Sequence, residues 1–190
     1  MPALQWLVLS PPCTAFDELL DAASFAANKH RDQRRKDADA TPYINHPLDV
    51  ARILAQAGVE DVEVLMAGIL HDTIEDTQTA AEELTELFGE RVCGLVLEVT
   101  DDKSLEKLER KRLQVVKAPT KSDGAKMVKI ADKIANLRDF NSPPVGWSEA
   151  RIGAYIQFSE MVARGCVGVN ERLDGAFKSA LGAVERNDQV

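Results

Sequence analysis

Apolar residues recur with the period of an α-helix along almost the whole of this 190-residue chain. In the clearest stretch they stand at positions i, i+3, i+4, i+7 and i+8, occupied by Val62, Leu65, Met66, Ile69 and Leu70. Such a stripe is the face that a helix turns toward a protein core. No stretch shows the sustained apolar–polar alternation of a half-buried β-strand. The pattern therefore predicts an all-α protein, a single bundle of about eight to ten helices.

Residues that start or stop helices divide the N-terminal part of the chain. Thr14 is the predicted N-cap of a helix that reaches about Arg31. Pro47 is the predicted first residue of a second helix, which stops before Gly58. Asp61 is expected to cap the third helix. These signals delimit three helices ahead of a strongly charged segment.

The remaining pattern predicts six further helices. The letters TAAE at 79–82 form the sequence of a capping box, and Gly89 is expected to end the helix that follows it. The other helices are expected over 92–99, 104–117, 124–140, 147–163 and 168–186. In the first helix, the residues expected to face the core are Phe16, Leu19, Leu20, Ala23, Ala26 and Ala27.

The composition is that of a folded globular domain, with 45% hydrophobic and 28% charged residues. The length predicts one domain, placed at 14–190, preceded by a loosely attached N-terminal arm at 1–13. No stretch approaches the roughly 20 apolar residues that a membrane-spanning helix requires. We therefore expect no membrane partner.

Cysteine usage indicates the cellular compartment, and net charge limits the classes of binding partner. Cys13, Cys93 and Cys166 are odd in number and have no CxxC spacing, which indicates a reducing compartment and predicts a cytoplasmic protein. The net charge of −8 argues against broad binding to nucleic acid or to anionic membranes. The assembly state is left open by the sequence, with a homodimer as one option.

One segment departs from the acidic balance. The stretch KHRDQRRKD at 29–37 carries five Lys and Arg residues and His30 against two aspartates. A local basic patch on an acidic protein suits a compact anionic ligand better than a long polymer. The alternative interpretation is a solvated basic loop.

The segment ILHDTIED at 69–76 places dense charge directly after an apolar helical stripe. His71 and Asp72 are adjacent at the C-terminal edge of the third helix, where one nitrogen and one oxygen ligand can reach an ion above the helix end. A complete site needs donors from other helices. The alternative is a helix-end hydrogen bond between the two side chains.

Two further residues are candidate donors. His46 precedes Pro47, which biases it toward an extended conformation at a helix start. Asp132 lies at the edge of a buried helical face, where an unpaired charge is expensive. Two histidines and two aspartates suit Mn²⁺, Fe or Zn²⁺ better than Ca²⁺. In the alternative interpretation, His46 is a capping residue and Asp132 pairs with Lys133 or Arg138.

In this order, His46, His71–Asp72 and Asp132 resemble the H…HD…D pattern of the HD superfamily of metal-dependent phosphohydrolases. The flanking letters RRKDADATPYINHP, ILHDTIEDT and KIADKIANLRD are similar to the hydrolase domain of RelA/SpoT proteins. The resemblance runs from about Phe16 to about Phe177 and leaves no room for a synthetase domain. The proteins that this chain resembles are therefore the stand-alone small alarmone hydrolases, including the metazoan type.

The resemblance implies an active site and a reaction. It implies one Mn²⁺ per chain held by the four residues His46, His71, Asp72 and Asp132, although these ligands also tolerate Fe or Zn²⁺. It implies hydrolysis of guanosine 3′,5′-bis(diphosphate) to GDP and pyrophosphate by a metal-activated water. Glu75 and Asp76 match the motif that accompanies this activity, Glu75 as the group that orients or deprotonates the water and Asp76 as its assistant.

The same resemblance assigns contacts to the nucleotide. Arg35 and Lys36 match a basic pair before the PYINHP segment, and Tyr43 closes that loop around the site. Asn136, one turn after the predicted ligand at 132, is expected to meet ribose or base. On the basic helix the candidates for the diphosphate are Lys107, Lys111 and Arg112. The sequence departs from the pattern of this family in the loop before Pro42 and Tyr43, where Ala40 and Thr41 stand in place of a glycine that is often found there.

Three alternatives stay open. In the first, the chain is a phosphatase of another ribose-phosphate nucleotide, such as the 2′-phosphate of NADPH. The sequence does not separate this activity from hydrolysis of guanosine 3′,5′-bis(diphosphate), because the 2′ and 3′ positions adjoin. In the second, it is a catalytically silent nucleotide-binding regulatory domain, which intact Glu75 and Asp76 argue against. In the third, it is an HD nucleotidase acting on 5′-monophosphates, which has no need of the basic loop or of this acidic pair.

Overall fold

The structure is a computed structural model that describes residues 14–141 and 144–187. The arm predicted at 1–13 lies outside these residues. The helices of the described part are α1 (Ala15–Lys29), α2 (Asn45–Gln56), α3 (Val62–Leu70), α4 (Thr73–Asp76), α5 (Ala81–Val99), α6 (Lys107–Lys117), η1 (Ala118–Thr120), α7 (Asp123–Arg138), η2 (Asp139–Asn141), α8 (Glu149–Arg164) and α9 (Glu171–Asn187), where η marks a 3₁₀ helix.

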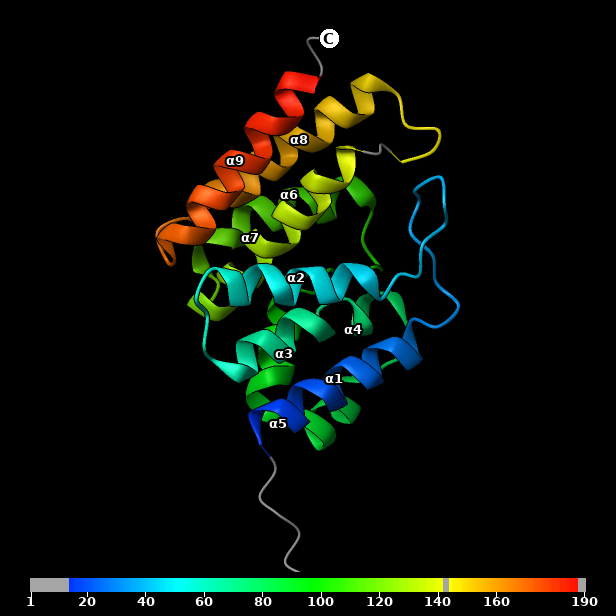
Figure 1. The fold of residues 1–190 in the computed structure, drawn as a ribbon, viewed down its shortest axis with the longest axis vertical. Helices are drawn as coiled ribbons and strands as arrows, with labels where there is room; N and C mark the ends of the chain where they lie inside the picture. The colour runs from blue at the N-terminus through cyan, green and yellow to red at the C-terminus, as the bar shows by residue number, and fades with distance from the viewer. Residues whose placement is uncertain (1–13, 142–143, 188–190) are drawn as a thin grey trace, which may run out of the picture.

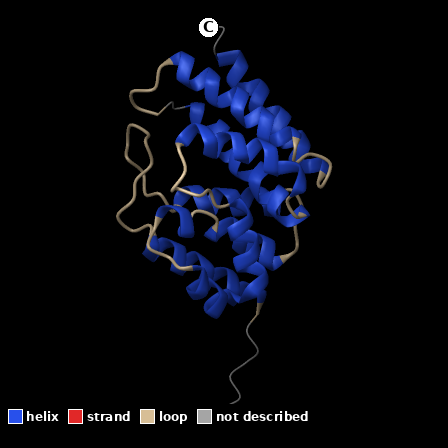
Figure 2. Cartoon of the chain, turned by 180° about the vertical axis from the view of Figure 1, so that it is seen from behind, coloured by secondary structure: helices blue, strands red, loops and turns tan. Residues whose placement is uncertain are grey.

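The predicted all-α fold is confirmed. Figure 2 shows helices joined by loops, and over residues 14–141 and 144–187 the only strand-like pairing is an isolated bridge between Arg34 and Pro42. The helices predicted on either side of Gly89 are two halves of α5, which the φ angle of 86° at this glycine kinks. The one-turn helix α4 was not predicted as a separate element.

Several helix boundaries follow the predicted capping chemistry. The Thr14 hydroxyl accepts a hydrogen bond from the Asp17 N–H at 3.3 Å, and the carboxylate of Asp61 accepts from two N–H groups of the first turn of α3. Gly58 follows α2 with φ 81°, the left-handed conformation that ends many helices. These local interactions explain why the starts of α1 and α3 were readable in the sequence.

Two predicted helix starts are wrong. Helix α2 begins at Asn45, ahead of Pro47, because N–H groups in the first helical turn have no intrahelical partner and a proline there removes no hydrogen bond. Helix α5 begins at Ala81 without a side-chain cap. The capping box predicted at 79–82 does not form, since the Thr79 hydroxyl is used in a hydrogen bond with that of Thr77, 2.7 Å away.

Helix α7 is at the centre of the bundle. It packs against α2, α3, α5, α8 and α9, and its residues Val128, Ile130, Ala131, Ile134 and Leu137 have no exposed surface. Each buried large aliphatic side chain contributes about 1.5–3 kcal/mol through the hydrophobic effect. Helix α2 crosses the middle of the molecule between α3 and α7 (Figure 1). The ends of α2 and α3 and the middle of α7 are thereby held close together.

The core face predicted for α1 is partly wrong. Phe16 and Leu20 are 78% and 68% exposed, whereas the buried residues of this helix are Ala22 and Ala26. Helix α1 packs on α3, and two alanines allow the backbones to approach closely. The apolar stripe is therefore displaced from the one that the large side chains suggested.

None of the helices described here combines the length with the apolar character that crossing a membrane requires.

The loop between α1 and α2 folds back on itself. The Arg35 N–H donates to the Thr41 carbonyl at 2.9 Å, and the Asp37 carboxylate accepts from the N–H and the hydroxyl of Thr41 at 3.0 and 2.6 Å. Within this turn Ala40 has φ 47°, in the left-handed region where a Cβ atom is unfavourable. Ala40 thus keeps the turn at the expense of backbone strain.

Ala40→Gly should stabilise the protein. Relief of left-handed strain, about 1–2 kcal/mol, exceeds the extra chain entropy of glycine, about 0.5–1 kcal/mol, so a net gain of roughly 0.5–1 kcal/mol is expected in urea unfolding. Ala38→Gly, in the same loop at a residue without positive φ, should lower stability by about 0.5–1 kcal/mol. Equal effects of the two substitutions would contradict the strain assigned to Ala40.

Candidate metal centre and adjoining cleft

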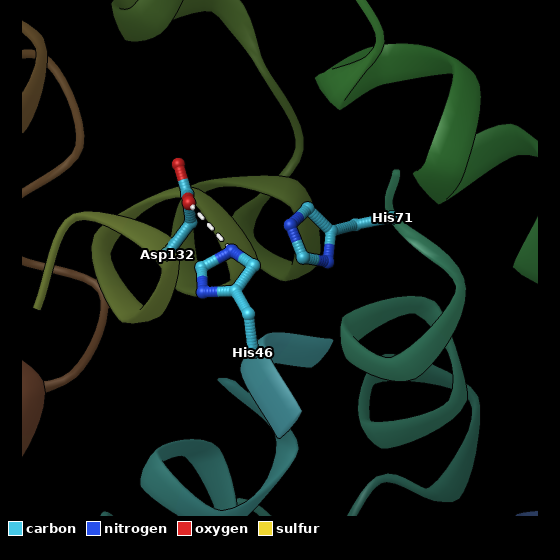
Figure 3. A group of neighbouring side chains, drawn as sticks. All are labelled: His46, His71 and Asp132. Carbon is cyan, nitrogen blue, oxygen red and sulfur yellow. Dashed lines mark ion pairs between the residues drawn. The ribbon is translucent and has the colours of Figure 1, made fainter. Parts of the chain in front are cut away.

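Three ligand-type side chains converge inside the bundle from three different helices. His46 lies in the first turn of α2, His71 is the C-cap of α3, and Asp132 lies in the middle of α7. One nitrogen or oxygen atom of each lies within 4.8 Å of the others, and all three residues are buried (Figure 3). The structure therefore brings together three of the four predicted ligands as one buried cluster.

His46 reaches the cluster from a helical backbone, so the predicted extended conformation is wrong. Its N–H donates to the Tyr43 carbonyl at 2.9 Å, which continues the turn before α2 into the helix. Its Nε2 lies 3.3 Å from Oδ1 of Asp132, and its ring centroid lies 5.3 Å from that of His71. The imidazole is thus packed edge-on against the second histidine.

The hydrogen bonds of His71 leave one nitrogen facing the cluster. Its Nδ1 lies 2.8 Å from the Gly68 carbonyl, which can only accept, so Nδ1 carries the proton. Its Nε2 is buried and has no hydrogen-bond partner, although Oδ2 of Asp72 lies 3.0 Å away. The distance is short but the geometry is not that of a hydrogen bond. A metal-binding histidine commonly has its other ring nitrogen on a backbone carbonyl, as Nδ1 has here, and Nε2 of His71 is then the nitrogen available to an ion.

Asp72 lies beside the three-residue cluster and is less buried. Its Oδ2 is 3.0 Å from Nε2 of His71 and 3.8 Å from Nε2 of His46. The Tyr43 hydroxyl donates to this same oxygen at 2.5 Å. Asp72 is therefore oriented toward both histidines by a side chain from the loop before α2.

Asp132 is held from both sides. Its Oδ1 faces His46 and accepts a hydrogen bond from Nδ2 of Asn136 at 2.5 Å, whereas its Oδ2 pairs with Nζ of Lys133 at 3.0 Å. The ion pair with Lys133, weighed as an alternative to metal binding, is present together with the cluster. One carboxylate oxygen is thus fixed by the lysine and the other faces the histidines.

The electrostatics of the cluster favour positive charge at its centre. Burial would raise the pKa of Asp132, but Lys133 and His46 outweigh burial and hold it well below its ordinary value. In the same way His71 keeps the pKa of Asp72 below its ordinary value. Burial alone would lower the pKa of His71, but the Asp72 carboxylate raises it to about 9. The ionised carboxylates thus favour a positive charge on the imidazole of His71, and a divalent cation can take the place of that proton on Nε2.

Glu75 and Asp76 lie on α4, immediately after the HD pair. Oε2 of Glu75 accepts from the Asp101 N–H at 3.0 Å, and burial raises the pKa of Glu75 while this N–H opposes the shift. Asp76 pairs with Nζ of Lys103 and accepts from Nε2 of Gln33 at 3.1 Å. Within the described chain neither carboxylate is bonded to a side chain of the cluster, and their catalytic roles stay predictions.

A cleft of about 440 Å³ adjoins the cluster. Tyr43 and Asn136 line the cleft and also bind Asp72 and Asp132, so they connect the two sites. Its lining residues are Gln33, Arg34, Arg35, Lys36, Asp37, Tyr43, Asp76, Asn136, Arg138, Asp139, Phe140, Pro144, Trp147 and Tyr155.

The predicted substrate contacts divide into two groups. Arg35, Lys36, Tyr43 and Asn136 line the cleft, and Arg35 is held there by Asn136 at 3.2 Å and by an ion pair with Asp139. The candidates on α6 do not line it. Lys107 and Arg112 are exposed, and Arg112 pairs with Glu109.

The third residue of that group, Lys111, lies behind the wall of the cleft. Its Nζ is 4.7 Å from the ring centroid of Phe158 and 5.9 Å from that of Tyr155, which lines the cleft. Burial lowers the pKa of Lys111. Its contacts are those of a cation packed on aromatic rings.

The sequence did not reveal the aromatic side of the cleft. Phe140, Trp147 and Tyr155 pack on one another at centroid distances of 5.5 to 6.0 Å, and Tyr155 meets the other two rings edge to face. These residues lie on η2, before α8 and within α8, far along the chain from the basic loop that they face. Only the packing of α8 against α7 brings them to the site, and no local pattern signals it.

Comparison with known proteins agrees with this site. A family model described as HD domain matches residues 22–151. The chain is similar to human guanosine-3′,5′-bis(diphosphate) 3′-pyrophosphohydrolase MESH1, with 57% identity over 163 residues that cover 85% of this chain and 91% of that protein. It is also similar to the guanosine-3′,5′-bis(diphosphate) 3′-pyrophosphohydrolase of Aquifex aeolicus, with 40% identity over 64% of this chain and 18% of that longer protein.

A solved structure gives the same result for the fold. It is described as a metazoan orthologue of SpoT that hydrolyses ppGpp and plays a role in starvation responses. It superposes with a TM-score of 0.85 at 45% sequence identity, covering 87% of this chain and 94% of that one. The arrangement of helices around the cluster is therefore shared with an experimentally determined structure.

Asp132→Asn should abolish tight binding of Mn²⁺. The substitution keeps the size of the side chain but removes the charge, and we expect a loss of affinity above the roughly ten- to hundredfold effect of changes outside the ligand set. Titration calorimetry with Mn²⁺ measures it, on protein whose circular dichroism shows a folded chain. Asp123→Asn, exposed at the start of the same helix, is the matched control. Equal Mn²⁺ affinity of the two variants would rule out Asp132 as a ligand.

Proposed function

The chain belongs to the HD domain family, and from this premise we propose that it is a guanosine-3′,5′-bis(diphosphate) 3′-pyrophosphohydrolase that converts ppGpp to GDP and pyrophosphate. The observation that carries the proposal is the position of the buried His46–His71–Asp132 cluster beside a cleft lined by arginine, lysine and aromatic side chains. The names of the similar proteins, at up to 57% identity, support the same reaction.

We propose that His46, His71, Asp72 and Asp132 hold one Mn²⁺, with Fe or Zn²⁺ compatible with the same donors. The buried Nε2 of His71, which has no hydrogen-bond partner, and the ionised carboxylates beside it support this assignment. When bound, a divalent ion supplies Lewis acidity to a phosphoryl oxygen and lowers the pKa of water. Lys133, Tyr43 and Asn136 orient the carboxylates for this task.

Hydrolysis requires water to form a bond with the phosphorus attached to the ribose 3′ oxygen while the bond from that oxygen to phosphorus breaks. The water must lose a proton, and the departing 3′ oxygen must gain one. We assign the first role to Glu75, since burial raises its pKa toward the range in which a carboxylate is an effective base. Asp76, on the wall of the cleft, is assigned to assist by orienting the reacting groups.

The cleft offers complementary surfaces for a nucleotide. Arg35 and Lys36 supply positive charge for the phosphates, and the half-buried guanidinium of Arg35 lies 5.6 Å above the ring of Tyr43. Trp147 and Tyr155 present aromatic rings on which a purine can stack. A small anionic nucleotide is therefore the proposed partner, rather than a nucleic acid or a membrane. A cytoplasmic location is proposed on the basis of the free thiols Cys93 and Cys166.

The proposal predicts metal-dependent release of pyrophosphate from ppGpp. Metal-stripped protein is assayed with and without Mn²⁺ on ppGpp and on NADPH in parallel, with products separated by ion-exchange chromatography. GDP and pyrophosphate should form only with Mn²⁺. Inorganic phosphate from NADPH at a comparable rate would assign the 2′-phosphate of that nucleotide as a second substrate. No metal-dependent turnover of ppGpp would refute the proposed function.

Glu75→Gln should separate metal binding from turnover. The amide oxygen can still accept from the Asp101 N–H, but it cannot take a proton from water, so a loss of roughly 10²–10⁴ in kcat is expected with Mn²⁺ affinity unchanged. Glu90→Gln, exposed on α5, is the matched control. The measurement is steady-state hydrolysis of ppGpp together with Mn²⁺ titration. Full kcat in the first variant would contradict the role given to Glu75.

A further inference from the structure

His30 is a buried histidine that belongs to none of the groups assigned above. It is 2% exposed, directly after α1, and its ring stacks on that of Tyr43 with centroids 4.9 Å apart. Its Nδ1 lies 2.8 Å from Oε1 of Gln33, whereas its Nε2 is buried without a hydrogen-bond partner. A buried polar atom without a hydrogen-bond partner is unusual in a folded protein and calls for an explanation.

The hydrogen bonds define the tautomer of His30. The side-chain oxygen of Gln33 only accepts, so Nδ1 must donate and carry the proton. Nε2 is left without a partner. A proton on Nε2 alone would bury an N–H donor without an acceptor and would place two acceptors 2.8 Å apart. The local structure therefore requires a proton on Nδ1 of His30.

The proton on Nδ1 and the amide of Gln33 hold each other in place. Nδ1–H of His30 donates to Oε1 of this amide, and its Nε2 donates at 3.1 Å to Oδ2 of Asp76, a carboxylate oxygen that only accepts. The backbone of Gln33 is also fixed, since its N–H donates to the His30 carbonyl at 2.9 Å and its carbonyl accepts from the Tyr43 N–H at 3.1 Å. A buried group on one side of the loop thus determines what Asp76 meets on the other side.

Asp76 depends on this donor for its orientation. The other bond to its carboxylate comes from Lys103, whose side chain is 49% exposed and whose long stem has many rotamers. Gln33 is tied down at its backbone and at its amide, so it is the rigid partner of the two. Without it, the carboxylate on the wall of the cleft is free to follow the lysine into solvent.

We propose that His30 and Gln33 are positioning residues for Asp76, acting as a hydrogen-bonded relay in which His30 sets the amide orientation and Gln33 sets the carboxylate. The proposal rests on the proposed function in one respect, namely that Asp76 takes part in turnover. The relay itself is a statement about protonation and orientation that holds whatever the substrate is. It makes the loop after α1 part of the catalytic apparatus as well as a source of positive charge.

Two substitutions at His30 separate the donor from the ring. His30→Phe keeps an aromatic ring against Tyr43 but removes the donor, whereas His30→Asn places an amide nitrogen at the position of Nδ1 and removes the ring. We expect the Phe variant to lose roughly ten- to a hundredfold in kcat for ppGpp with KM changed less than about threefold, the size of effect typical of a lost orienting partner. The Asn variant should stay within about threefold of the wild type, because the donor is restored.

Gln33→Glu tests the second link. It keeps an acceptor for His30 but places a carboxylate against Asp76, so the same selective loss of kcat is expected. In the double variant His30→Phe with Gln33→Glu, the loss should be no larger than that of the worse single variant, because both act through one path. Mn²⁺ affinity should equal that of the wild type in all four proteins, since none of the altered groups is bonded to the cluster.

The outcomes decide between positioning and mere packing. Wild-type kcat in the Phe variant, a larger loss in the Asn than in the Phe variant, or multiplying losses in the double variant would each overturn the relay. Nitrogen-15 NMR of histidine-labelled wild-type protein gives a readout that is independent of activity. His30 should carry its proton on Nδ1. A single proton on Nε2 instead would overturn the proposal. Absence of ppGpp hydrolysis by the wild type would remove the proposed function, while the NMR result would still decide the orientation argument.

Discussion

Burial of the Asp132 carboxylate in the middle of α7 is the constraint on which the rest of this structure depends. An ionised carboxylate inside a helical bundle is destabilising by several kcal/mol unless it is paired and hydrogen-bonded. Here one oxygen meets Lys133 and the other meets Asn136 and His46. Those partners come from α7 itself and from α2, so satisfying one charge fixes how the two helices pack. A divalent cation bound between the same groups, as proposed above, would complete the compensation.

The loop before α2 connects this buried charge to the surface. Tyr43 donates to Asp72 beside the cluster, packs against the ring of His30 and lines the cleft. In the same loop Arg35 binds Asn136, which in turn binds Asp132. Tyr43 and Arg35, which line the cleft, are therefore each bonded to a group at or next to the cluster. Such coupling holds the cleft and the cluster in one geometry, which is what a reaction at a defined phosphorus atom requires.

The helices and the His46–His71–Asp132 cluster could be predicted from the sequence more completely than the cleft could. The start of α3 was predictable because Asp61 caps it locally, and the convergence of His46, His71 and Asp132 was predictable because the motif order stood in the chain. The start of α2 was not, since a proline in the first turn is neutral to hydrogen bonding and so marks no single position. The sequence did not predict that Trp147 and Tyr155 line the cleft, or which groups donate to Asp76, because contacts between distant segments leave no local pattern in the sequence.

Whether this cluster is a metal centre is decided most directly by anomalous diffraction at the manganese absorption edge from crystals soaked in Mn²⁺. We expect one strong peak per chain within about 2.0–2.6 Å of Nε2 of His46, Nε2 of His71 and a carboxylate oxygen of Asp132, the range of nitrogen and oxygen ligands of divalent ions. A peak at other side chains, with these three residues left uncoordinated, would contradict it.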